Sequence, residues 1–459
     1  MAGACDKGLT DINRNPNGPT EVSAEFLFPQ GAVASVATAR GANFDMTFTS
    51  LFAQHLAKIQ YTEEDRYDIR PESNDGWWQA FYAVALQDLH QAAKDAGQRQ
   101  RPNLLAPALT MRSWTFGAMT DVWGDIPYSE ANQGMEAGAT ITPKYDRQPD
   151  IYNGILAELK SASDMIVPGA ASYGSADPIY AGDAAKWKKF ANSLRLRYAM
   201  RMSKADPAKA QAEVQAALQA GVFTSNADNA RLVWPGDAIN DHPIFQNFKT
   251  RDDHRVSRTM VNMLQSLNDP RLAVYARPAE NTGQFLGVPN GLTSPDANAL
   301  GLANTSRIGV FYSSRNSASM LMDYAEVLFI QAEAAARGWI SGNAADLYRQ
   351  AITASLQANG ISAAAIATYL AQPAVQYNGL ASIHQQQWIA FYTQGIEAWS
   401  LWRRTGVPNL QPGPAAFVNQ VPRRLPYPSS EQTFNNANRE AAIAAQGGAG
   451  YVNRVWWDK

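Results

Sequence analysis

The chain has 459 residues, of which 46% are hydrophobic and 17% are charged, and its formal net charge is −2. That length is enough for about three domains and for a large core. A charge so close to balance provides no basic surface for phosphates, so nucleic acid is excluded as an expected partner. No apolar run reaches the roughly 20 residues that a transmembrane helix needs.

The single cysteine, Cys5, follows four residues, Met1 to Ala4, and precedes a polar run. One thiol cannot form an internal disulfide, and a residue this close to a chain end is not expected in the core. Small residues before such a cysteine resemble a bacterial lipoprotein processing site, although an incidental thiol is the alternative. We expect Cys5 to be lipidated, with any export signal already removed. Residues 1–20 would then be a tether and residues 21–459 a single domain.

Apolar residues recur every three or four positions along several segments, which predicts amphipathic helices. Asp206 and Pro207 are suited to the start of one of these helices, as N-cap and first helical residue. Small residues alternate with aromatic ones in two consecutive helices, as in tetratricopeptide helix pairs. Because the repeats are irregular, we expect one mainly α-helical domain. In chain order the predicted helices are 77–96, 104–122, 150–165, 187–202, 207–221, 320–339, 344–358 and 383–404.

Long segments rich in Gly, Asn, Ser and Pro separate these helices, at 125–149, 223–258, 277–318 and 405–438. Loops of this length are usually functional or disordered. Aromatic rings can cover the apolar face of a sugar, while amide and charged groups bind its hydroxyls. Two segments combine these residue types, 61–78 and 285–316. The predicted ligand-binding residues are Asp65, Arg66, Tyr67, Trp77, Trp78, Phe285, Tyr312, Arg315 and Asn316.

Trp77 and Trp78 are adjacent on a predicted helix, and adjacent helical residues point about 100° apart. Both rings therefore cannot be fully buried on one apolar stripe. We expect one ring to be the first buried residue on the core side of the helix, and the other ring to lie off that apolar stripe.

The sequence gives no strong sign of catalysis. The histidines have no short metal-ligand spacing, and neither a nucleophile elbow nor a phosphate loop is present. The carboxylate pairs Glu63–Glu64 and Asp252–Asp253 are adjacent, so their side chains diverge, whereas a glycosidase needs two carboxyls facing one bond. We expect no catalytic residue, no metal and no cofactor, and keep a helical glycosidase as an alternative. The histidines are His55, His90, His242, His254 and His384.

Several segments together resemble the SusD/RagB family of Bacteroidetes surface lipoproteins. The most specific are YAEVLFIQAEA at 324–334 and GIEAWSLWRRTG at 395–406. Cys5 with the segment 9–17, TDVWGDIPYSEA at 120–131, WKKFANSLRLR at 187–197 and RLPYP at 424–428 are also similar, in the same order as in the family. We interpret these motifs as scaffold, in which Arg195, Arg197, Arg403 and Arg404 pair with Glu326 and Glu333 or cap helix ends.

The resemblance implies a tetratricopeptide-like helical scaffold whose long loops present a binding face. It also implies a cell-surface protein of the outer membrane, attached to the membrane only through its lipid. This protein would capture an oligosaccharide and deliver it to a SusC-like TonB-dependent transporter as part of glycan utilisation. A peptide or glycopeptide receptor of the same uptake type is the alternative, and a scaffold protein that binds neither is a further one.

Overall fold

The computed structural model describes residues 22–136 and 138–459. The expected tether at 1–20 and the expected lipidation site Cys5 lie outside the described residues. The described chain is mainly helical and its strands are few and short, which confirms the mainly α fold class. Among the described residues, no helix has the length and apolarity that a membrane crossing requires.

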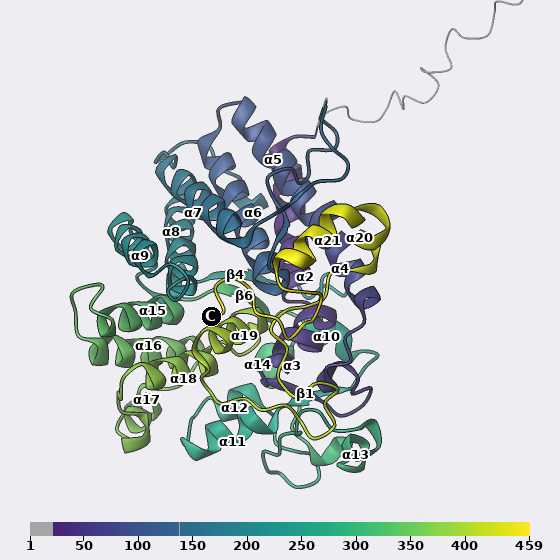
Figure 1. Cartoon of the computed structure of the whole chain (residues 1–459). Helices are drawn as coiled ribbons and strands as arrows, with labels where there is room; N and C mark the ends of the chain where they lie inside the picture. Colours follow the sequence, from purple (N-terminus) through teal and green to yellow (C-terminus); the bar gives the residue numbers. More distant parts are fainter. Residues whose placement is uncertain (1–21, 137) are drawn as a thin grey trace, which may run out of the picture.

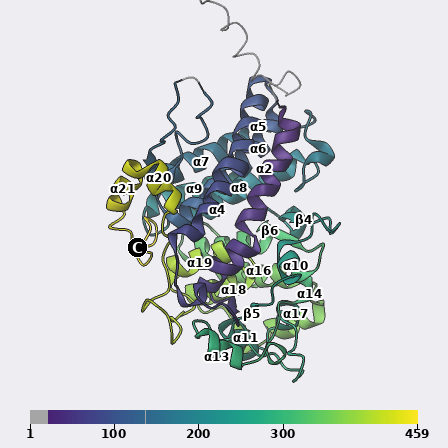
Figure 2. The same cartoon turned by 90° about the vertical axis from the view of Figure 1, so that its right-hand side faces the viewer.

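The first half of the chain forms a layer of long helices, in which neighbours in sequence from α5 to α9 pack against one another. Helix α2 lies alongside α5 and α6, as Figure 2 shows. The helices are α2 (Ala24–Ala39), the π-helix η1 (Ala42–Thr49), α3 (Ser50–Phe52), the 3₁₀ turns η2 (Glu64–Arg66) and η3 (Pro71–Asn74), α4 (Asp75–Gln79), the π-helix η4 (Ala80–Leu86), α5 (Gln87–Gln98), α6 (Pro102–Trp123), α7 (Gln148–Asp164), η5 (Gly174–Ala176), α8 (Ala184–Arg201) and α9 (Pro207–Ala220).

The second half continues with the pair α15 and α16, against which α18 packs, while shorter helices lie at the bottom of Figure 1. Helix α19 packs on η1 and α3 and so joins the two halves. The helices are η6 (Asn226–Asp228), α10 (Pro243–Phe248), α11 (Arg258–Ser266), α12 (Leu272–Tyr275), α13 (Ser294–Ala299), η7 (Leu302–Asn304), α14 (Val310–Ser313), α15 (Tyr324–Ala336), α16 (Ala344–Ala358), α17 (Ala363–Leu370), η8 (Pro373–Val375), α18 (Leu380–Ala390), α19 (Gly395–Thr405), α20 (Ser429–Phe434) and α21 (Asn436–Ala445).

Three antiparallel strand pairs connect segments that are far apart in sequence. Strand β1 (Leu56–Lys58) pairs with β5 (His254–Val256), with Ala57 opposite Arg255. Strand β2 (Ile126–Pro127) pairs with β3 (Tyr145–Asp146). Strand β4 (Ala230–Val233) pairs with β6 (Ala318–Met322) through a register shift between Ala230 and Arg231. These pairs anchor the ends of the long loops.

Six of the predicted helices are confirmed, with ends shifted by a few residues: 77–96, 104–122, 150–165, 187–202, 207–221 and 344–358. The predicted cap is also confirmed, since the Asp206 carboxylate accepts a hydrogen bond from the backbone N–H of Lys209 at 3.2 Å. The first of these segments is helical throughout but changes from α to π at Ala80.

The helix predicted at 320–339 is wrong at its beginning, because residues 318–322 form strand β6. The helix begins after Asp323, whose carboxylate accepts a hydrogen bond from the backbone N–H of Glu326 at 2.8 Å. Buried strands and buried helices share the same apolar character over short stretches, so the periodicity hid this boundary.

The single helix predicted at 383–404 is also wrong, because α18 ends at Ala390 and α19 begins at Gly395. Thr393 in the connection has a φ of 62°, in the left-handed region. Gly395 lies so close to η1 and α3 that a Cβ there would be 2.1 Å from Oδ1 of Asp45 and 2.6 Å from the backbone N of Ser50. The apolar pattern runs through the break because both helices are buried.

Buried arginine–carboxylate pairs hold the long helices together. Arg197 on α8 donates to Glu326 of α15, with Nε 2.6 Å from Oε1, and its Nη1 lies 3.2 Å from Oε1 of Glu397 on α19. Arg201, one turn further on, pairs with Glu397 and with Asp121 of α6. Burial alone would raise the pKa of Glu397, but the charges of the arginines lower it to about 2.

A second buried pair joins α19 to α15, since Arg404 donates to both carboxylate oxygens of Glu333 at 2.6 and 2.7 Å. Arg403 instead lies over the ring of Trp399, with its guanidinium carbon 3.6 Å from the ring centroid. The expected pairing of arginines with Glu326 and Glu333 is therefore confirmed for Arg197 and Arg404.

We expect Glu397→Gln to lower the free energy of unfolding by about 3–5 kcal/mol, because it removes the buried carboxylate that Arg197 and Arg201 share and leaves each arginine with one buried partner in place of two. Urea unfolding followed by circular dichroism measures this loss. Asp164→Asn is the matched control, since the Lys160–Asp164 pair is exposed and should contribute less than about 1 kcal/mol. Similar losses for the two variants would contradict the role of the buried network.

Burial lowers the pKa of His55 to about 3, against a weaker opposing effect of the Trp388 backbone. In the unfolded chain a histidine titrates near pH 6.5, at about its ordinary pKa. Between pH 6.5 and 3 the unfolded chain therefore binds a proton that the folded protein does not, so stability falls as the pH falls.

His55→Phe should remove this pH dependence. Between pH 7 and pH 5 the wild type should lose about 2 kcal/mol more stability than the variant. Urea unfolding of both proteins at the two pH values measures the difference. Equal losses would show that His55 does not remain neutral in the folded protein.

Candidate functional site

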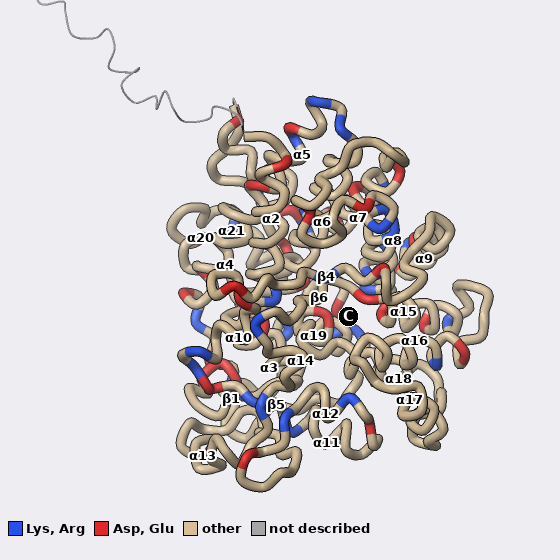
Figure 3. Tube along the Cα trace, turned by 180° about the vertical axis from the view of Figure 1, so that it is seen from behind, with Lys and Arg blue, Asp and Glu red and all other residues tan. Residues whose placement is uncertain are grey.

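The structure contains a polar cleft of about 920 Å³, lined by residues from the segments 37–48, 58–64, 73–80 and 241–254. Helix α2, the π-helix η1, strand β1, helix α4 and helix α10 contribute to its walls. Clefts of this size commonly bind small molecules. Lys and Arg lie beside Asp and Glu near β1, β5 and α10, as Figure 3 shows.

Trp77 is a half-buried wall of the polar cleft. Its ring is edge-on to two phenylalanines of η1, with centroids 5.5 Å from Phe44 and 4.9 Å from Phe48. Such edge-to-face contacts fix the orientation of an aromatic ring. The cleft therefore offers a rigid indole surface to a ligand.

Charged side chains that line the same cleft hold one another in place. Nζ of Lys58 lies 2.9 Å from Oε2 of Glu64 and 3.5 Å from Oδ2 of Asp253. Nη2 of Arg251 lies 3.1 Å from the same oxygen of Asp253. The guanidinium of Arg251 also lies over the exposed ring of Tyr61, 5.0 Å from its centroid. These contacts orient donors and acceptors beside Trp77 before any ligand arrives.

Burial alone would raise the pKa of Asp253, but His254, Lys58 and Arg251 together hold it well below its usual range. Asp253 therefore remains ionised at physiological pH. A carboxylate in this state accepts hydrogen bonds from hydroxyl groups but cannot donate a proton.

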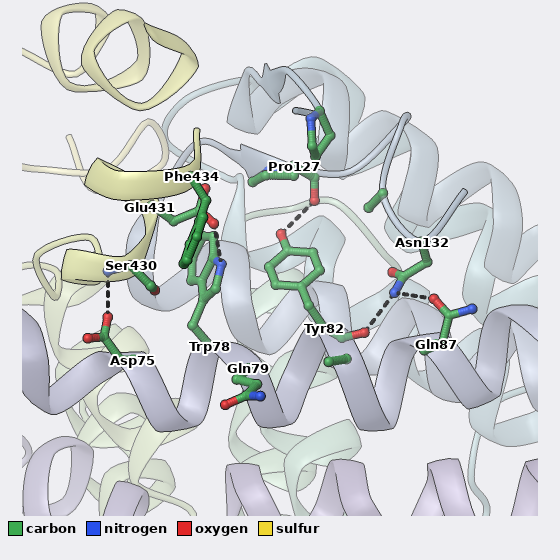
Figure 4. Close-up of a pocket in the computed structure, with 13 residues that line it drawn as sticks. Asp75, Trp78, Gln79, Tyr82, Gln87, Pro127, Asn132, Ser430, Glu431 and Phe434 are labelled. Atoms are coloured by element: carbon green, nitrogen blue, oxygen red, sulfur yellow. Dashed lines mark hydrogen bonds between the residues drawn. The ribbon is translucent and has the colours of Figure 1, made fainter. Parts of the chain in front are cut away.

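Trp77 and Trp78 face two different cavities, as the turn of about 100° between adjacent helical residues allows. Trp77 lines the polar cleft, whereas Trp78 lines a second cavity of about 500 Å³, which we name the aromatic pocket. Figure 4 shows this pocket between α4, η4, the segment 127–143 and helix α20. Its walls include Trp78, Tyr82 and Phe434.

Two of the residues predicted to bind ligand are fully buried, Asp65 and Tyr67. Asp65 accepts hydrogen bonds from Nδ2 of Asn290 at 2.7 Å and from the backbone N–H groups of Lys58 and Gly291. Burial raises its pKa to about 6, although these hydrogen bonds oppose the rise. Neither side chain offers a surface to a ligand in this conformation. Asp65 instead ties the loop 61–78 to the loop 285–316.

Arg66 and Phe285 are half-buried and lie outside the polar cleft and the aromatic pocket. Nε of Arg66 donates to the carbonyl of Ala415 at 2.9 Å, and its guanidinium lies over the ring of Phe417. Phe285 packs against the core. In the structure, Arg66 and Phe285 are therefore engaged in contacts within the protein.

The remaining predicted residues lie on the segment 312–316. Tyr312 and Asn316 line a third cavity, of about 490 Å³, where the Tyr312 hydroxyl donates to Oδ1 of Asn359 at 2.6 Å. Arg315 is exposed, and its Nε lies 3.0 Å from Oδ1 of Asp241, which lines the polar cleft. Arg315 therefore supports the edge of that cleft.

Sequence reasoning missed several residues that line the polar cleft, among them Lys58, Asp241, Asn247 and Arg251. Three of them belong to the segment 223–258, which was predicted only as a long loop. The adjacent pair Asp252–Asp253 was a signal, but it was considered only for catalysis. Among the described residues, no group of three or more His, Cys, Asp or Glu could hold a metal ion.

The fold and the cleft together define a helical scaffold with a candidate ligand-binding cleft. Residues 16–428 match the sequence model of the SusD-like family, described as starch-binding and associating with the outer membrane. The chain belongs to this family, whose members are binding proteins. No curated protein matches the chain.

Solved structures agree with this assignment. The chain is similar to a chitin-binding protein at 29% identity and a TM-score of 0.83, with 94% of this chain and 99% of that chain covered. It is similar to a chitin-binding SusD homolog from Flavobacterium johnsoniae at 26% identity and a TM-score of 0.85, with 94% and 98% covered. A SusD homolog from Bacteroides uniformis shares 25% identity at a TM-score of 0.85, with 95% and 99% covered.

Proposed function

We propose that the polar cleft binds an oligosaccharide at the cell surface, and that the protein delivers it to a SusC-like TonB-dependent transporter. The observation that carries this proposal is the rigid ring of Trp77 beside fixed donors and acceptors in one cleft. A pyranose has an apolar face for the indole and hydroxyls for the charged and amide groups. Attachment through a lipid on Cys5 belongs to the same proposal.

The substrate we propose is a glycan with N-acetylglucosamine units. This choice is supported by two solved relatives described as chitin-binding, at 29% and 26% identity. The amide side chains of Gln246 and Asn247 line the polar cleft and could exchange hydrogen bonds with an acetamido group.

The charges in the cleft favour binding over hydrolysis. A glycosidase needs one carboxyl that donates a proton and a second carboxylate. Glu64 and Asp253 both contact Lys58, and the pKa of Asp253 is held low. Asp253 is therefore not suited to be the proton donor, and Glu64 is engaged by Nζ of Lys58 at 2.9 Å. We propose capture and release without turnover.

We expect Trp77→Ala to weaken binding of the β-1,4-linked N-acetylglucosamine hexamer at least about 10-fold, a loss of about 1.4 kcal/mol, because the aromatic surface is removed. Isothermal titration calorimetry measures the affinity. Affinity electrophoresis in gels containing chitin-derived, starch and β-glucan polymers first tests which glycan binds. A protein that binds peptides and none of these glycans would overturn the proposal.

Because Trp77 packs on Phe44 and Phe48, its removal also costs stability, so a second variant is needed. Arg251→Ala removes a half-exposed side chain and should also weaken binding. Arg454→Ala is the matched control, since Arg454 makes a similar ion pair with Asp458 at 3.1 Å and does not line the cleft. Tyr312→Ala tests the third cavity, which this proposal does not need.

A further inference from the structure

The aromatic pocket shares no lining residue with the polar cleft and takes no part in the proposed site. It is concave, holds about 500 Å³ and has a mainly apolar lining. Trp78 and Tyr82 come from the helix, Pro127 and Pro143 from the segment after α6, and Phe434 from α20 (Figure 4). Segments more than 300 residues apart in sequence thus meet around one cavity.

Its aromatic surface is rigid. Nε1 of Trp78 donates to Oε1 of Glu431 at 3.2 Å, and its ring lies edge-on to Trp123 with centroids 5.3 Å apart. The Tyr82 hydroxyl donates to the carbonyl of Pro127 at 2.6 Å. Both rings are held by the protein, so a ligand would not need to order them.

Two carboxylates at the pocket receive hydrogen bonds only from neutral donors among the described residues. Asp75 accepts from the backbone N–H of Ser430 at 2.9 Å and from the Ser429 hydroxyl at 2.5 Å. Glu431 accepts from Trp78 and from the Tyr145 hydroxyl at 2.6 Å. A carboxylate has about four acceptor positions, so both can accept further hydrogen bonds.

These acceptors would form strong hydrogen bonds with a ligand rich in hydroxyl or N–H groups. Burial alone would raise the pKa of Asp75, but hydrogen bonds from Ser429 and Ser430 lower it. Asp75 therefore remains an acceptor at physiological pH. The exposed amide of Gln79 adds a donor and an acceptor on the same wall.

Phe434 is 75% exposed at the edge of the pocket. A large aromatic side chain kept in water gains nothing for folding, whereas it could close over one face of a ligand whose other face lies on Trp78. Phe434 and Trp78 line the same pocket, together with Glu431 (Figure 4).

We propose that the aromatic pocket is a second sugar-binding subsite, which binds a pyranose unit of the same glycan as the polar cleft. This inference rests on the proposed function, because the aromatic pocket and the polar cleft would bind the same class of ligand. The rings of Trp78, Tyr82 and Phe434 bind the apolar faces, while Asp75, Gln79 and Glu431 bind hydroxyls.

Residues of one continuous helical segment, 75–83, line both subsites, and the diameter of a helix with its side chains is about 10–12 Å. On this proposal a long glycan, or two segments of one polysaccharide, engages both. Binding at the second subsite is then intramolecular, which raises the apparent affinity for polymers above that for short oligomers.

The test uses the full chain and the β-1,4-linked N-acetylglucosamine hexamer. We expect Phe434→Ala and Gln79→Ala each to weaken binding at least about 3-fold in calorimetry. Phe26→Ala is the matched control, because Phe26 on α2 is also 75% exposed and does not line the pocket. Both altered side chains are exposed, so the variants should melt at the wild-type temperature. Unchanged affinity in both variants would overturn the second subsite.

Crystals soaked in the trimer of the same sugar separate this inference from the proposed function. Sugar density between Trp78 and Phe434 supports the second subsite. Density only beside Trp77 overturns it and leaves the proposed function intact. Density only in the aromatic pocket supports it and removes the polar cleft as the capture site. Sugar in neither place overturns both.

Discussion

The buried ionic contacts of Arg197 fix the arrangement on which the remainder of the molecule depends. This side chain joins α8 to both α15 and α19, and Arg201 extends the network to α6. Charges removed from water are costly unless every partner is present, so these helices have few alternative relative positions. No member of this network lies in the loops 61–78 and 285–316, so exposed residues of these loops can vary without loss of its ion pairs.

Both candidate sites follow from the placement of one short helix. Because α4 lies between two cavities, consecutive tryptophans contribute to both of them. The π-helical turns η1 and η4 lie next to it, and the residues of η1 support the ring of Trp77. π-Helical segments are frequent at functional sites. Asp65 contributes in a different way, since its buried hydrogen bonds hold together the two loops that were expected to contact ligand.

The sequence was informative where a pattern repeats and uninformative where it does not. Amphipathic periodicity located most long helices, but it could not show the break at Thr393, where the apolar pattern continues and only the close contact of Gly395 with Asp45 explains the turn. Trp77 could be predicted because two adjacent tryptophans on a helix cannot both lie on one buried stripe. Lys58 and Arg251 could not, since isolated charges are usual on any surface, and Phe434 reaches its pocket from more than 300 residues away.

The segment 234–253 lies between two paired strands, so its cleft residues can be exchanged while its ends stay in place. Strand β4 before it is paired with β6, and strand β5 after it is paired with β1, so both ends are fixed independently of what lies between them. The segment supplies Asp241, Asn247 and Arg251 to the polar cleft but no member of the buried Arg197 network. Exchanging its cleft residues for those of a relative, while keeping the core residues Trp234 and Ile244, is therefore a direct way to engineer new sugar specificity.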